Sequence, residues 1–127
     1  MEKLSTGGKF GWFLDTLSKS GIFVKNLSDR EIETYIFEDF IVGVISFMQT
    51  KNLQELKEYG IIDDKIMKMS LDLRERTIKL DNSELWNVES VKHSSVWLGI
   101  LGLSDELKSL INTKCTVEEI DYLKTVK

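Results

Sequence analysis

The residue types that most often carry enzyme chemistry are scarce in this sequence. It contains one histidine, His93, and one cysteine, Cys115. A thiolate nucleophile with an imidazole base would require these two side chains to meet, and no local signature of a catalytic cysteine surrounds Cys115. A zinc site is also disfavoured, because one histidine and one cysteine cannot supply the usual ligand spacing. We expect a structural or surface role for both residues.

The carboxylates are the other candidates for chemistry. Four of them fall on the early turns of one predicted helix, and two that follow later in the chain could come near: Glu31, Glu33, Glu38, Asp39, Asp63 and Asp64. Together they resemble a crude metal or acid/base site. A carboxylate-bridged metal site in a helical bundle, however, uses Glu-x-x-His pairs on facing helices, and the sequence has no such pair. We therefore predict no catalytic residues, no metal site and no cofactor.

The distribution of charge along the chain is more informative than any motif. Residues 31–64 carry eight acidic side chains and two lysines, a net charge of −6, whereas the whole chain has a net charge of −4. An acidic surface complements a basic one, such as the substrate cleft of a nuclease, because opposite fields steer association. The alternative is that these carboxylates serve helix dipoles and solvated faces. We predict that the six carboxylates bind a partner, and the alternative stays open.

Net charge and hydropathy narrow the choice of partner and location. An excess of acidic residues disfavours nucleic acid and anionic membranes as the main partner. The longest apolar run, residues 40–48, has about half of the length that a membrane-spanning helix needs. The first residues lack the continuous apolar region of a secretory signal, and a single cysteine fits a reducing compartment. The expected location is the cytoplasm.

Length and composition predict one all-α domain over residues 1–127. A chain of this size buries about two-thirds of the surface that its unfolded form exposes. It lacks proline altogether, and proline is the residue that most often marks loops, turns and sheet edges. Helices joined by short connections fit this composition best. We predict a compact bundle of about six to eight short helices.

Capping signals and apolar periodicity place the helices of the first half. A first helix is expected through Phe10 and Leu17, ending before Gly21. Residues 21–26 are expected to form a connector with two inward side chains, and a short strand is the alternative. Ser28 and Glu31 form a capping box. The helix that follows becomes apolar on all sides in its C-terminal half, which predicts that this half penetrates the core.

The second half of the chain supplies further helix starts. They are predicted at Asn52, at Asp63 or Asp64, at Ser94 or Ser95, at Ser104, and at a second capping box formed by Thr116 and Glu119. The segments before and after Ser104 are thus expected to be separate helices.

The three tryptophans are candidates for the core or for an interface. Trp12, Trp86 and Trp97 are each expected to pack in the core, because large aromatic side chains contribute most of their energy there. An exposed one would instead be an interface anchor, since tryptophan is enriched among binding hot spots.

Residues 85–104, with the sequence LWNVESVKHSSVWLGILGLS, resemble helical immunity proteins of bacterial contact-dependent inhibition systems. The likeness lies in Trp86 followed by Glu89, then serines, then Trp97 and an apolar helix. It implies an antidote that binds a cognate toxin domain, most readily a nuclease, and blocks its active site. A non-catalytic helical adaptor that binds a protein or peptide is the alternative. An enzyme is the least favoured class.

Overall fold

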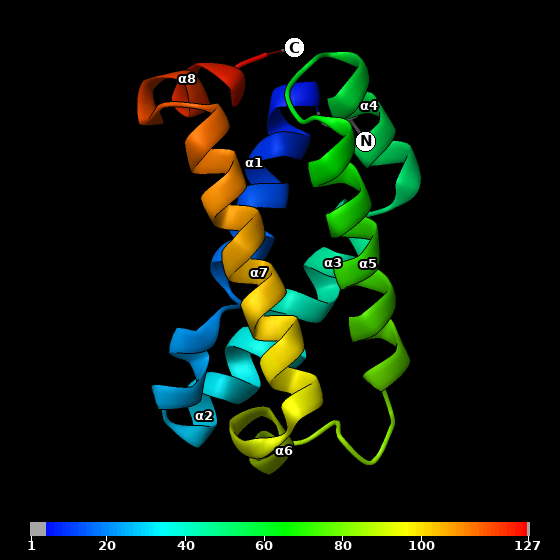
Figure 1. Ribbon diagram of the computed structural model, residues 1–127, viewed down its shortest axis with the longest axis vertical. Coiled ribbons are helices and arrows are strands. Elements are labelled where there is room, and N and C mark those ends of the chain that lie inside the picture. The colour runs from blue at the N-terminus through cyan, green and yellow to red at the C-terminus, as the bar shows by residue number, and fades with distance from the viewer. Residues whose placement is uncertain (1–4, 127) are drawn as a thin grey trace.

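The computed structural model describes residues 5–126, and every regular element in that range is helical (Figure 1). The protein is 79% helical, and residues 5–126 contain no strand. These residues form seven helices when α2, η2 and α3 are counted as one continuous helix and the short 3-10 helix η1 is not counted. This confirms the predicted all-α class. The elements are α1 (Thr6–Ser18), the 3-10 helix η1 (Ile22–Asn26), α2 (Asp29–Ile32), the π-helix η2 (Glu33–Phe40), α3 (Ile41–Phe47), α4 (Thr50–Glu58), α5 (Asp64–Leu80), α6 (Val88–His93), α7 (Ser95–Lys114) and α8 (Val117–Leu123).

The helices α5 and α7 lie side by side and run in opposite directions, with α1 behind them (Figure 1). α1 packs against α3, α4 and α7, so it is the element that joins the two halves of the bundle. One hydrophobic core runs through these contacts. Its fully buried members include Phe10, Phe13, Ile32, Ile36, Phe40, Val44, Met48, Leu53, Leu56, Leu73, Val91, Trp97, Ile100, Leu101 and Leu107.

Both predicted capping boxes are confirmed. The Ser28 hydroxyl accepts a hydrogen bond from the Glu31 N–H, and the Glu31 carboxylate accepts one from the Ser28 N–H, each at 3.2 Å. Thr116 and Glu119 repeat the arrangement at the start of α8. The cap predicted at Asn52 is wrong, because α4 begins at Thr50. The Asn52 amide instead donates to the carbonyl oxygen of Ser46, which the end of α3 leaves without a helical partner.

The two helices predicted around Ser104 are one continuous helix, α7. The Ser104 hydroxyl is fully buried, where it donates to the Ile100 carbonyl oxygen at 3.2 Å and is hydrogen-bonded to the Ser20 hydroxyl at 2.9 Å. A serine that bonds back to the preceding turn continues a helix, whereas a capping serine begins one. Tertiary contact with Ser20 therefore decides its role.

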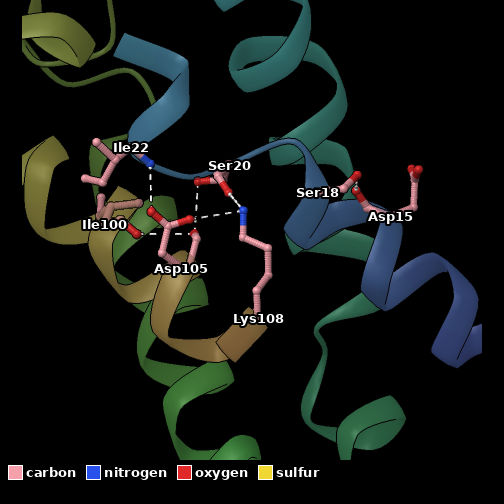
Figure 2. A network of polar contacts seen from close by, with 8 residues as sticks. Asp15, Ser18, Ser20, Ile22, Ile100, Asp105 and Lys108 are labelled. Atoms are coloured by element: carbon pink, nitrogen blue, oxygen red, sulfur yellow. Dashed lines mark hydrogen bonds and ion pairs between the residues drawn. The ribbon is translucent and has the colours of Figure 1, made fainter. Parts of the chain in front are cut away.

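Residues 21–26 form a connector, as predicted, and the strand alternative is wrong. Val24 is the only fully buried side chain of η1, so one side chain turns inward where two were expected. Polar contacts with α7 hold the connector in place (Figure 2). The Ile22 N–H donates to Asp105 at 3.0 Å, and the Lys108 ammonium donates to the Ser20 carbonyl oxygen at 2.7 Å.

The continuous helix over residues 29–47 contains an eight-residue π-helical segment, η2. Its fully buried side chains, with that of Met48 just after its end, follow a period of four: Ile32, Ile36, Phe40, Val44 and Met48. Ile41, also buried, lies beside this row. In an α-helix, side chains four apart drift by about 40° per step. A π-helix has more residues in each turn, because its hydrogen bonds join residues five apart. The π-helical segment thus keeps a period-four apolar row on one face.

The prediction that the C-terminal half of this helix is surrounded by core is wrong on one side. Val42 is 57% exposed and Ile45 is 43% exposed. Val44 and Met48 face the core, whereas Val42 points away from it and Ile45 lies next to Val42 on the helix surface. The helix therefore presents an apolar face to the outside.

No helix in residues 5–126 combines the length and the apolar character that crossing a membrane requires.

Replacing Phe40 by alanine tests the core. Phe40 is fully buried on the period-four row, so Phe40→Ala is expected to lower the free energy of unfolding by about 3–5 kcal/mol. The exposed Val42 provides the control, and Val42→Ala should change it by no more than about 0.5 kcal/mol. Urea denaturation measures both. Equal effects of the two substitutions would contradict the assigned faces of this helix.

Candidate partner-binding groove

A groove of about 560 Å³ runs between α1 and the η2–α3 part of the long helix. On α1, Trp12, Thr16 and Lys19 line it at the spacing of one helix face. On the other wall, side chains from Phe37 to Phe47 line it, and Gly43 stands at its centre. The groove residues of α1 lie on the face opposite to its buried phenylalanines, so the same helix serves the core and the groove.

The floor of the groove is a close approach of α1 and α3. A Cβ atom on Gly43 would overlap the Thr16 hydroxyl oxygen and lie 2.7 Å from its Cγ2 atom. The Thr16 hydroxyl donates to the carbonyl oxygen of Trp12 at 2.8 Å, which leaves it tucked against its own helix. Glycine is therefore required at position 43 for steric reasons, because it lets another helix come this near.

Two stacked aromatic rings form one end of the groove. The Trp12 and Phe47 rings lie 5.1 Å apart and are nearly parallel, with an angle of 8° between their planes. Trp12 nevertheless remains 47% exposed, and the exposed Val42 and Ile45 lie nearby on the helix that carries Phe47. The predicted core location is thus wrong for Trp12. An exposed tryptophan among other apolar side chains is typical of an interface anchor.

The other end of the groove is ionic. Lys19 Nζ lies 3.7 Å from an Asp39 carboxylate oxygen and 5.0 Å from the centre of the Tyr35 ring. Asp15 and Glu38 also line the groove, and within residues 5–126 neither carboxylate forms an ion pair. Three carboxylates and one ammonium give this end a net charge of −2 at neutral pH.

The six predicted partner-binding carboxylates do not form one surface. Glu38 and Asp39 line the groove. Glu31 is used in the capping box of α2, and Glu33 is exposed at the start of η2.

Asp63 and Asp64 lie at the start of α5, at the end of the molecule opposite α2 (Figure 1). Asp63 caps α5 by accepting from the Ile66 N–H at 2.8 Å. Hydrogen bonds from Lys68 and then Lys57 hold the pKa of the Asp64 carboxyl below its ordinary value. The charges of both residues are used within the fold, and the expectation that they join the other carboxylates is wrong.

The structure separates His93 from Cys115, so the two cannot form a thiolate pair. They flank α7, whose twenty residues span about 30 Å. His93 is exposed, 3.5 Å from Glu89. Burial, followed by the nearby Glu119 carboxylate, raises the pKa of the Cys115 thiol, which keeps it protonated at neutral pH. Within the described part of the chain, no three His, Cys, Asp or Glu side chains are grouped so that they could hold a metal ion.

An aromatic cluster supports the groove from behind. Phe37 lines the groove and also contacts Trp86 and Trp97, with ring centres 4.9 Å and 6.3 Å away. Trp97 is fully buried, as expected, and its indole N–H donates to the Leu85 carbonyl oxygen at 2.7 Å. Trp86 is half-buried against the core. These two tryptophans therefore act in packing, and η2 rests on them.

Sequence reasoning found the acidic side of the groove and missed the α1 side. Trp12, Asp15 and Lys19 carried a signal, because they share one face of the first predicted helix, away from Phe10 and Phe13. That face alone does not predict which helix forms the other wall of the groove, or that α1 contacts this helix at Gly43.

No protein-family model, no curated protein and no solved structure matches this chain. The family suggested by residues 85–104 therefore stays a prediction.

A Cβ atom at position 43 tests the floor of the groove. Gly43→Ala should lower the free energy of unfolding by about 1–3 kcal/mol, because the new methyl group overlaps Thr16. Thr16→Ala in the same chain should restore part of that loss. Gly102, on α7, has no neighbour within 4 Å of an added Cβ atom, so Gly102→Ala should stabilise by about 0.5–1 kcal/mol. Thermal and urea unfolding compare the variants, and a harmless Gly43→Ala would rule out the close approach.

Proposed function

We propose that this protein is a non-catalytic binding module that covers a basic surface of a protein partner with the groove between α1 and η2–α3. The partner in this proposal is a bacterial toxin domain, a nuclease in particular, whose active site the module blocks. The observation that carries the proposal is one groove that holds the exposed Trp12 ring, stacked on Phe47, at one end and, at the other, carboxylates without an ion pair among residues 5–126.

The aromatic end supports binding to a protein. Removing apolar surface from water contributes about 25 cal/mol per Å² of favourable free energy. The exposed parts of Trp12, Val42 and Ile45 stay in contact with water in the folded protein and do not contribute this free energy. A partner that covers these side chains gains this free energy as binding energy. The stack on Phe47 also holds the Trp12 ring in one orientation before binding, which reduces the entropy lost on association.

The ionic end supports a basic partner. Asp15 and Glu38 lie at the edge of the groove without an ion-pair partner among residues 5–126. Carboxylates in such a position attract a cationic surface and repel nucleic acid and anionic membranes. An enzyme that cleaves nucleic acid needs a basic cleft for its substrate, so its active site is the kind of surface that this groove complements.

The resemblance of residues 85–104 to immunity proteins supports the toxin as the particular partner. In this structure those residues contribute Trp86 and Trp97 to packing behind the groove. The resemblance therefore concerns the scaffold, while the groove residues determine which partner binds. This division suits a protein that must match one toxin closely.

Reversing the groove charges tests the proposal. The domain encoded directly upstream of this gene is purified, or co-expressed with this protein if it is toxic. Asp15→Lys with Glu38→Lys should slow its association by about tenfold and weaken the salt dependence, because charges at an edge act mainly on encounter. Growth protection should fall in parallel. Stopped-flow fluorescence measures the association rate.

The matched control is Glu84→Lys with Asp121→Lys, which changes the net charge equally at exposed sites outside the groove. It should leave the association rate within about twofold. A neighbouring domain that is harmless to cells contradicts the toxin as partner. A bound domain that responds equally to both double variants contradicts the groove as the site.

A further inference from the structure

We propose that Lys19 is an internal competitor for the partner's cation, and that the groove accepts an amphipathic helix whose arginine displaces Lys19 from Asp39. This inference rests on the proposed function, since it names the element of the partner that enters the same groove.

The ion pair between Lys19 and Asp39 is long and partly exposed. At 3.7 Å it is the longest of the ion pairs between described residues, whose other members range from 2.6 to 3.5 Å. The Asp39 side chain remains 44% exposed. One ammonium at this distance leaves the carboxylate oxygens open to a second donor, and exposed pairs of this kind are weak.

Lys19 has a second favourable contact, with Tyr35, when a partner's cation binds Asp39. Its ammonium lies 5.0 Å from the centre of the Tyr35 ring, within the range of a cation–π interaction. Tyr35 in turn stands edge-on to Phe23, with ring centres 6.2 Å apart, so its ring is held in place. Displacement from Asp39 therefore does not leave Lys19 without a favourable contact.

Arginine suits the vacated carboxylate better than lysine does. Its planar guanidinium can donate two parallel hydrogen bonds to one carboxylate, whereas an ammonium acts as a point charge. The neighbouring Glu38 and Asp15 add negative charge at the same end of the groove. An incoming arginine thus gains contacts that Lys19 does not make.

The two ends of the groove specify a helix. Trp12 and Lys19 are seven residues apart on α1, about 10 Å along the helix axis. A partner helix running along α1 would therefore place an apolar side chain on Trp12 and Phe47, and an arginine at Asp39, two turns apart. The walls are both helical and offer no strand edge for pairing, and the spacing of two turns matches the way an amphipathic helix binds in a groove.

The test uses two opposite substitutions at position 19. The probe is an alanine-based helical peptide of about 18 residues with leucine and arginine seven positions apart. Lys19→Met removes the competitor and should tighten peptide binding by about two- to fivefold. Lys19→Arg keeps the net charge but forms a stronger ion pair with Asp39. It should weaken peptide binding by a similar factor. Binding is followed by the NMR signal of the Trp12 indole N–H.

Two controls separate competition from other effects. Lys114→Met makes the same charge change at the end of α7, and should alter peptide affinity by less than Lys19→Met does. A peptide with glutamine in place of arginine should bind weakly and respond to neither variant. A purely structural role of Lys19 would move both substitutions in the same direction.

Failure of this inference is distinct from failure of the proposed function. Unchanged or weaker binding by Lys19→Met overturns the competitor role, even where the groove still binds the whole partner. Absence of peptide binding in all variants overturns the helix as occupant. The proposed function itself is judged only by the charge reversals with the intact partner domain.

Discussion

The close approach of α1 and α3 at Gly43 and Thr16 is the contact on which the rest of this surface depends. Because Gly43 has no side chain, the Thr16 side chain packs directly against the α3 backbone there. The longer side chains that line the groove stand on either side of this contact along the two helices. Trp12 and Phe47 take one end, and Lys19 and Asp39 take the other. A single missing Cβ atom thus turns a helix contact into a groove with two distinct ends.

The two ends contribute little to the stability of the isolated protein. The exposed face of Trp12 is not removed from water, and an ion pair as long and as exposed as Lys19–Asp39 gains little Coulomb energy. The free energy that holds the bundle comes instead from the buried row between Ile32 and Met48 and from the contacts of α5 with α7. The exposed side chains at the two ends of the groove can therefore change with little effect on the core, whereas Gly43 and Thr16 at its floor cannot.

Much of the fold could be predicted because its causes are local. A capping box joins residues three apart, so the start of α2 at Ser28 follows from four neighbouring residues. Only half of the candidate site could be predicted from such local signals. Glu38 and Asp39 were found from charge, but Asp63 and Asp64 were wrongly grouped with them, because a net charge counted along the chain carries no information on direction in space. The π-helical segment was not predicted, because apolar residues fill several faces of this helix and mark no single turn length.

The sequence by itself determined the helical class, the helix starts at Ser28 and Thr116, and most of the residues that avoid water. These depend on interactions within one turn or on the apolar character of a side chain. Tertiary structure alone decided that Ser104 continues a helix, that Asn52 serves the end of α3, and that Trp12 stays exposed. Asn52 bonds to a carbonyl oxygen only six residues earlier, which is free because α3 ends there. The roles of Ser104 and Trp12 depend on which distant segments come near. That proximity arises from the packing of whole helices against one another, which no local pattern specifies.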